Sequence, residues 1–130
     1  MPPLLGRSPN MAKMLFIVSK GFDNAGLAVR AIQFAGIAAD KGHHVEIFLI
    51  EDAVYWAQYG MATGVYSVTG DHMQAFVDKL VQAKAIMHVC KPCAEKRLIS
   101  PDDLIPIAKL SLGSDLADLI ANPEYKVVSF

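Results

Sequence analysis

The sequence is poor in charge, and its charged residues form no long block of either sign. They make up 19% of the 130 residues, and 12 basic against 13 acidic side chains leave a formal net charge of -1. A nucleic-acid footprint and a polybasic membrane patch both need clustered Lys and Arg, so neither partner is indicated. Long hydrophobic runs are also missing, since none reaches the roughly 18 residues of a membrane span.

Cysteine is scarce, with Cys90 and Cys93 as the two in the chain. Two thiols are half of the usual structural zinc set, and none of the four histidines stands at the spacing that would complete it, so we expect no metal site within one chain. The opening segment "MPPLLGRSPN" lacks the apolar stretch of a signal peptide. We therefore expect a cytoplasmic protein, in a reducing compartment where structural disulfides are rare.

Nucleotide-binding and hydrolase motifs are missing as well. The glycines of "KGFDNAG" do not follow the G-x-G-x-x-G pattern of dinucleotide-binding loops, and no P-loop signature is present. The chain also lacks the G-x-S-x-G motif of serine hydrolases. These absences lead us to expect no bound cofactor.

Apolar residues are abundant, at 53% of the chain, and they fall into alternating patterns. Short continuous apolar runs predict strands at 14–19, 44–50, 85–89 and 125–130, with a weaker one within 105–112. Helical spacing predicts helices at 27–42, 71–85 and 113–122, the second with Asp71 as its N-cap. Strands that alternate with helices indicate an α/β fold with a mostly parallel sheet.

The length predicts a single domain, which we expect to span residues 13–130. A second methionine, Met11, stands just before the first apolar run. Residues 1–12 are therefore expected to be a flexible N-terminal arm, an upstream start or the remnant of a tag.

The stretch "VCKPCAEKR", residues 89–97, is the most informative motif. Cys90 follows the third predicted strand, and in a parallel sheet sites form beyond the carboxyl ends of strands. Pro92 suits the first turn of a helix. The helix N-terminus, together with Lys91 and Arg97, is expected to favour the thiolate and to hold the pKa of Cys90 below the ordinary cysteine value of ~8.5.

Other interpretations of the two thiols stay open at this point. Subunits could share a zinc ion, and a C-x-x-C pair near a β-α-β unit also suits thioredoxin-like redox chemistry. Both cysteines could instead be small buried apolar residues.

Several residues could support the thiols, each with a plainer structural role beside the functional one. Asp23 and Asn24 follow the first strand at the same sheet edge, although such residues more often make loop and capping contacts. His88 lies two residues before Cys90, on the same side of its strand, and could tune the thiolate or only form structural hydrogen bonds.

Two further groups lie after the second strand. Glu51 and Asp52 end it and are expected to cap the next element rather than bind a ligand. The aromatic residues that follow (Tyr55, Trp56 and Tyr59) are expected to lie in a subunit interface, where aromatic side chains are enriched.

Taken in order, four segments resemble the DsrE/DsrF-like family: "KMLFIVSKGFDNAG", "KGHHVEIFLIEDAV", "HVCKPCAEKR" and "YKVVSF". The resemblance covers residues 13–130. It implies a three-layer α/β/α fold with about five strands, homotrimers or homohexamers, and a sulfur-carrying cysteine after the third strand. That cysteine corresponds to Cys90, Cys93 to a second cysteine of some members, and Arg97 to the basic residue that follows. Leu98 departs from the family, in which glycine is common at this position.

The resemblance implies a function in sulfur relay. Cys90 would accept sulfane sulfur as a persulfide from a donor protein and pass it to a thiol of an acceptor protein. Cys93 could then resolve the persulfide, or have only a structural role. The alternative is a non-catalytic oligomeric module that binds a ligand or a partner, since fold alone does not give function.

Overall fold

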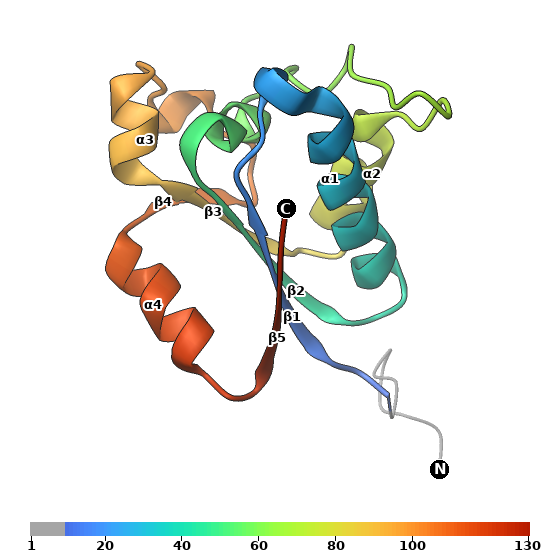
Figure 1. Ribbon diagram of the computed structural model, residues 1–130, viewed down its shortest axis with the longest axis vertical. Coiled ribbons are helices and arrows are strands. Elements are labelled where there is room, and N and C mark those ends of the chain that lie inside the picture. The colour runs from blue at the N-terminus through green and yellow to red at the C-terminus, as the bar shows by residue number, and fades with distance from the viewer. Residues whose placement is uncertain (1–9) are drawn as a thin grey trace.

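Five apolar segments pair into one parallel sheet in the computed structural model, which describes residues 10–130 (Figure 1). The strands are β1 (Lys13–Val18), β2 (His44–Leu49), β3 (Ile86–Cys90), β4 (Ala108–Ser111) and β5 (Tyr125–Ser129), in the order β4-β3-β2-β1-β5. The predicted strands are thus all present. Most of the expected N-terminal arm lies outside the described residues, but Ala12 is described, and its N–H donates to His43 Nδ1 at 3.0 Å.

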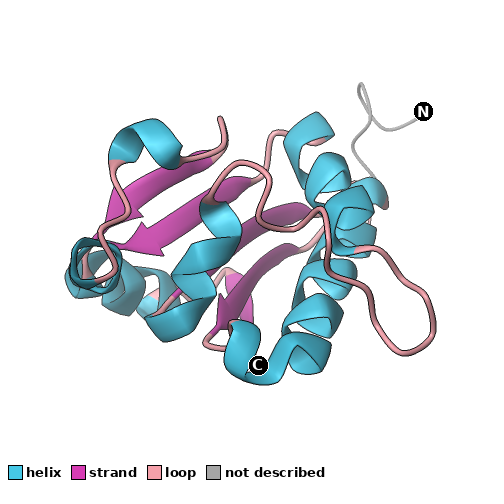
Figure 2. Cartoon of the chain, turned by 90° about the horizontal axis from the view of Figure 1, so that it is seen from above, coloured by secondary structure: helices cyan, strands magenta, loops and turns pink. Residues whose placement is uncertain are grey.

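Helices cover both faces of this sheet (Figure 2). They are α1 (Ala25–Asp40), α2 (Met73–Gln82), α3 (Lys91–Lys96) and α4 (Gly113–Ala121), with short 3-10 turns η2 (Phe22–Asn24), η3 (Glu51–Ala57) and η4 (Pro101–Asp103). From β1 to β4 the chain advances in one direction across the sheet, so right-handed crossovers place α1 and α2 on the same face. The return from β4 to β5 runs the other way and carries α4 over the opposite face (Figure 1). The expected three-layer α/β/α architecture is confirmed.

The main core lies between the sheet and the pair α1–α2. Alternate residues of the central strands, such as Ile47 and Met87, are fully buried there against apolar residues of both helices. Trp56 of η3 joins this core at 1% exposure, and its indole N–H donates to the carbonyl of Lys20 at 2.8 Å. The expectation that Trp56 lies in a subunit interface is therefore wrong, because its indole is buried in the core of the chain itself. Tyr59, from the same predicted group, is exposed.

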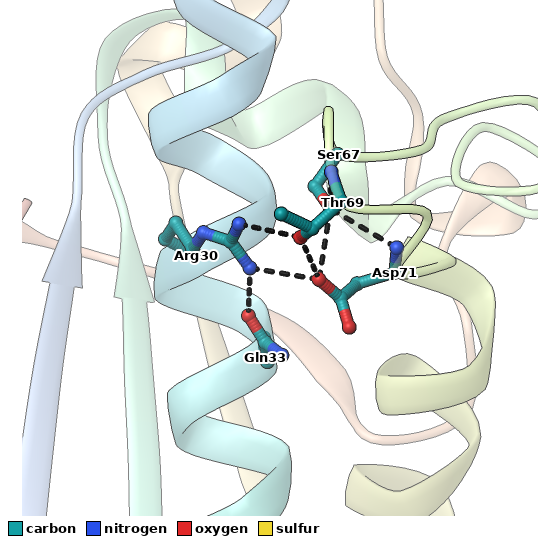
Figure 3. A network of polar contacts seen from close by, with 5 residues as sticks. All are labelled: Arg30, Gln33, Ser67, Thr69 and Asp71. Atoms are coloured by element: carbon teal, nitrogen blue, oxygen red, sulfur yellow. Dashed lines mark hydrogen bonds and ion pairs between the residues drawn. The ribbon is translucent and has the colours of Figure 1, made fainter.

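The loop between η3 and α2 is fixed by an ionic network with α1 (Figure 3). Arg30 Nη1 lies 2.9 Å from Asp71 Oδ2, and Arg30 Nη2 donates to Thr69 Oγ1 at 2.8 Å. Hydrogen bonds from Thr69, Arg30 and Ser67 lower the pKa of Asp71 to about 2. Asp71 was predicted as the N-cap of α2, which is wrong: His72 takes that position, and the carboxylate of Asp71 is held by Arg30.

Close packing of α1 against α2 depends on the absence of a side chain at Gly36. A Cβ atom at this position would lie 2.9 Å from the backbone oxygen of Phe76 and 3.0 Å from its Cβ. Gly26 lies in the same helix but has space around it, since a Cβ atom there would lie 3.9 Å from its nearest neighbour, Asn24 Oδ1. The two glycines therefore form a matched pair.

Gly36→Ala is expected to leave the protein less stable than Gly26→Ala by about 1–3 kcal/mol, the usual penalty for overpacking a core. Gly36 lies in the interior of α1 and Gly26 is its second residue, so Gly36→Ala gains at least as much helix propensity, roughly 1 kcal/mol. A lower stability of Gly36→Ala therefore comes from the contact between α1 and α2. Urea unfolding of the two variants measures it. Equal stabilities would show that the helices separate without cost.

Candidate functional site

The two cysteines lie where β3 ends and α3 begins. Cys90 is the last residue of β3 and the N-cap of α3, Pro92 occupies the first turn, and Cys93 follows one residue later. Both thiols are free and half-buried. Cys90 is the last residue of β3, which pairs in parallel with β2 and β4. The thiols therefore lie at the carboxyl edge of the sheet, as predicted.

Cys93 connects this edge to the end of β2. Its Sγ accepts a hydrogen bond from the backbone N–H of Glu51 at 3.3 Å. Glu51 has a φ of 50°, in the left-handed region that few residues other than glycine adopt. Asp52 next to it is approached closely by Gly21, where a Cβ would lie 2.5 Å from the Asp52 carbonyl oxygen. The loop after β1, the start of η3 and the thiols are thus packed into one unit.

Cys90 does not have the lowered pKa that its position predicted. Burial raises the pKa of this thiol, and the neighbouring Cys93 thiol and the Glu51 carboxylate raise it further; a hydrogen bond from the backbone of Cys93 acts in the other direction. The prediction is wrong because burial, the Cys93 thiol and the Glu51 carboxylate together outweigh the N-terminus of α3, a helix of only six residues. Lys91 and Lys96 are exposed.

Arg97 is held by Asp52 rather than by the thiols. Its Nε and Nη2 atoms lie 3.0 and 2.6 Å from Asp52 Oδ1, and its Nη1 donates to the carbonyl of Cys93 at 3.0 Å. The bond to Asp52 raises the pKa of Arg97, so the guanidinium stays charged. Arg97 therefore clamps α3 onto η3. Leu98 follows with a φ of 59°, in the left-handed region that glycine adopts more readily than leucine.

Asp23 and Asn24 make local contacts instead of lining the thiols. Asp23 Oδ1 accepts from the N–H of Gly21 at 2.8 Å, and Asn24 Oδ1 caps α1 by accepting from the N–H of Leu27 at 3.2 Å. Asp23 and Asn24 therefore have the loop and capping roles that were expected in preference to a role at the thiols.

His88 belongs to a second, separate cluster on the face covered by α4. It is buried, its Nε2 lies 2.7 Å from Glu46 Oε1, and its Nδ1 lies 2.9 Å from Ser111 Oγ. The other carboxylate oxygen of Glu46 is bonded by His44 Nε2 at 2.9 Å and by the hydroxyl of Tyr125. We call these five residues the Glu46 cluster. Of its five members, His88 alone was predicted from the sequence as a candidate site residue.

Glu46 and Ser111 went unrecognised because each lies in a segment that its apolar residues assigned to a strand of the sheet. An acidic residue in the middle of "HVEIFLI" was the available signal, since a buried carboxylate must find donors. Burial on its own raises the pKa of Glu46, but hydrogen bonds from His88, Tyr125 and His44 outweigh it and lower the pKa from 4.5 to about 2. The cluster therefore holds a carboxylate, not a carboxylic acid.

A cavity of about 400 Å³ opens between this face and α4. It is lined by residues of β3, β4, α4 and β5: His88, Lys109, Leu110, Ser111, Asp115, Asp118, Leu119, Asn122 and Tyr125. Among residues 10–130, no three His, Cys, Asp or Glu side chains are grouped so that they could hold a metal ion. None of the helices in this part of the chain has the length and apolar character that crossing a membrane requires.

The alkylation of Cys90 by iodoacetamide should show a pH midpoint above that of the same thiol in an unstructured peptide, because burial raises its pKa. Cys93→Ala should move the midpoint down, since it removes the neighbouring thiol. Mass spectrometry of the Cys90 peptide against pH measures both. A midpoint below that of the peptide would show instead that the N-terminus of α3 lowers the pKa of Cys90.

Glu46 should make stability fall in acid. Its folded pKa of about 2 lies below the ordinary 4.5, so its contribution is complete above pH 4.5 and is lost as the pH falls towards 2. The loss is on the order of 3 kcal/mol. Glu46→Gln should remove this slope, whereas Glu124→Gln, an exposed carboxylate 3.4 Å from Lys13, should keep it. Urea unfolding at several pH values gives the comparison, and equal slopes in both variants would contradict it.

Comparison with known sequences identifies relatives along most of the chain. The sequence model of the DsrE/DsrF-like family matches residues 12–130. The uncharacterized protein MJ0989 of Methanocaldococcus jannaschii is 31% identical over 103 residues, which cover 79% of this chain and 86% of that protein. The uncharacterized protein MK0008 of Methanopyrus kandleri is 29% identical over 93 residues, which cover 72% of this chain and 74% of that protein.

Solved structures with the same architecture agree with this assignment. The ychN protein from E. coli superposes with a TM-score of 0.77 at 20% identity, over 92% of this chain and 100% of that chain. MTH1491 from Methanobacterium thermoautotrophicum, a protein of unknown function, superposes with a TM-score of 0.64 at 12% identity, over 92% of this chain and 99% of that chain. These likenesses show a shared fold, and the match over residues 12–130 shows the family: this chain belongs to the DsrE/DsrF-like family.

Proposed function

We propose that this protein is a sulfur-relay protein that carries sulfane sulfur as a persulfide on Cys90. Membership in the DsrE/DsrF-like family suggests a function of this type. The observation that carries the finer proposal is the position of Cys90, half-buried at the carboxyl edge of the sheet and in contact with a second free thiol. Such a thiol is within reach of a partner yet shielded from bulk solvent.

In the loading step, the Cys90 thiolate attacks the outer sulfur of a donor persulfide. The donor's sulfur–sulfur bond breaks, the donor leaves as a thiolate that takes up the proton given off by Cys90, and Cys90 becomes a persulfide. In the delivery step, an acceptor thiolate attacks the outer sulfur and Cys90 returns to its thiol. Because burial raises the pKa of Cys90, its thiolate forms less readily than that of an exposed cysteine, and the departing donor thiolate takes up the proton.

Cys93 provides a way to end the cycle. Its thiolate attacks the inner sulfur of the Cys90 persulfide, releases hydrosulfide and leaves a disulfide between Cys90 and Cys93, which cellular thiols then reduce. The contact between the two thiols supports this role. Cys93 Sγ is also held by the N–H of Glu51, so the resolving sulfur is positioned before loading occurs.

The other predicted site residues support the thiols indirectly. Arg97, through Asp52 and the carbonyl of Cys93, holds the first turn of α3 in place. Lys91 is exposed at the start of α3, beside the thiols, where it would attract an acidic partner surface. His88 is bound within the Glu46 cluster, to Glu46 and Ser111, and takes no part in the proposed relay.

The proposal includes a protein donor, a protein acceptor and self-assembly in the cytoplasm. Proteins of this family generally interact with partners and form oligomers. We propose a homotrimer or homohexamer, for which the described chain offers several exposed apolar side chains: Phe22, Phe34, Tyr59, Leu98, Leu112, Ile120, Val127 and Val128.

Incubation with a low-molecular-weight persulfide should add one sulfur atom to the peptide that contains Cys90. Cys90→Ser should abolish the addition, whereas Cys93→Ser should keep it and lengthen its lifetime, because the resolving thiol is gone. Intact and peptide mass spectrometry measure both. An unmodified Cys90 that still reacts with an alkylating agent would reject the relay and favour a non-catalytic binding module.

A further inference from the structure

Three side chains of the Glu46 cluster form a continuous polar chain across neighbouring strands. Glu46 comes from β2, His88 from β3 and Ser111 from β4, and all three are at least nine-tenths buried. The distances are 2.7 Å from Glu46 Oε1 to His88 Nε2 and 2.9 Å from His88 Nδ1 to Ser111 Oγ. The order of the chain is carboxylate, imidazole, hydroxyl.

The partners define which atom of His88 carries the proton. Glu46 is an ionised carboxylate and can only accept, so it is Nε2–H of His88 that donates to it. When the imidazole carries that single proton, the lone pair of Nδ1 faces Ser111, and the hydroxyl of Ser111 donates to it. A nucleophile bonded to a base that is itself oriented by a carboxylate is the arrangement that activates serine in hydrolases.

Other contacts hold the base and the carboxylate still. The ring of His88 stacks on Phe48, with centroids 5.2 Å apart and planes 13° from parallel. The second oxygen of Glu46 is bonded by His44 and Tyr125. These contacts fix the plane of the imidazole and the orientation of the carboxylate. A catalytic base needs such fixing, because it must accept the proton along one direction.

Space for a substrate lies directly against the nucleophile and the base. Ser111 and His88 both line the cavity of about 400 Å³ beneath α4, a volume within the range of small-molecule sites. α4 begins at Gly113, two residues after Ser111, and the first N–H groups of a helix have no acceptor within it. The N–H of Leu112 is taken by Asp115 at 2.7 Å, and neither Gly113 nor Ser114 lines the cavity, so the proposal rests on the carboxylate, the imidazole and the hydroxyl alone.

We propose that Ser111, His88 and Glu46 form an acyl-transfer site that hydrolyses small carboxylic esters in the cavity beneath α4. Ser111 Oγ bonds to the acyl carbon while its proton passes to His88 Nδ1. The ester bond breaks, and the alcohol leaves with that proton. Water then gives a proton to His88 and its hydroxide to the acyl carbon, which releases the carboxylic acid and restores the Ser111 hydroxyl. The activity is independent of Cys90.

The sequence alone does not signal such a site. The pattern around Ser111 is "KLSLG", which has the glycine after the serine but not the one before it in G-x-S-x-G. Glu46 and His88 are far from Ser111 in sequence, and parallel pairing of three strands brings them together. The resemblance to a serine hydrolase therefore lies in the three-dimensional arrangement of these side chains and not in a sequence motif.

A small alkyl fluorophosphonate tests the assignment. Attack by Ser111 on phosphorus displaces fluoride, so the expected result is one covalent adduct on the Ser111 peptide. Ser111→Ala should lose it, and His88→Gln and Glu46→Gln should slow its formation roughly a hundredfold, as expected for losing a base or its orienting group. Glu124→Gln, at an exposed carboxylate outside both sites, should label as the unmodified protein does.

Ser67 is a matched control within the chain. It is buried to a similar degree and its hydroxyl donates to the carboxylate of Asp71 at 2.9 Å, without an imidazole between them. It should remain unlabelled. Hydrolysis of p-nitrophenyl acetate by the Cys90→Ser variant, and its loss on adding Ser111→Ala, gives a second readout free of thiol chemistry.

Two results would overturn the proposal. One is an unlabelled Ser111 under conditions in which a known serine esterase is fully labelled. The other is labelling of Ser111 that does not slow in His88→Gln, since the hydroxyl would then not be activated. Because Glu46→Gln also removes structural hydrogen bonds, the decision rests on Ser111→Ala, which deletes one hydroxyl, with circular dichroism as the check on folding.

Discussion

Parallel pairing of β3 with β2 and β4 is the constraint on which both sites depend. The ladder fixes Cys90 beside Ser111 and His88 beside Lys109 and Phe48. Since the last residue of the strand is Cys90, the thiol emerges at the sheet edge where η3 and α3 begin. Since alternate residues face opposite sides, His88 points towards α4 while its neighbours Met87 and Val89 fill the main core.

The two faces of the sheet are covered unequally, and their chemistry differs accordingly. The face under α1 and α2 is apolar and closely packed, with a glycine needed at the helix contact. The face under α4 carries a buried carboxylate, two histidines and a cavity, while α4 itself buries no residue. A buried carboxylate is tolerated only when donors surround it, and here three side chains supply them. Polar groups therefore take the place of apolar packing on this side.

The fold could be predicted from the sequence because it rests on local patterns. Each strand is a short apolar run, Gly42 and Asn24 mark the ends of α1, and the order of elements leaves few topologies. The position of Cys90 at the end of β3 could be predicted in the same way, from the apolar run before it and from Pro92 in the first turn of the next helix. The electrostatics did not follow, because the pKa of Cys90 depends on burial and on Glu51, which only the fold brings near. Asp71 and Trp56 were misassigned for a similar reason: their partners, Arg30 and Lys20, lie far away in the sequence.

The close approach of Gly21 to the Asp52 backbone makes tolerance to mutation uneven around the thiols. Residues on the outer surface of α3, such as Lys91 and Glu95, can vary freely without disturbing the backbone that carries the sulfur atoms. A side chain at position 21, by contrast, would push on the very segment that supplies both the N–H donor to Cys93 and the carboxylate that holds Arg97. A residue with no functional group of its own thus governs the geometry of the thiols from a loop two strands away.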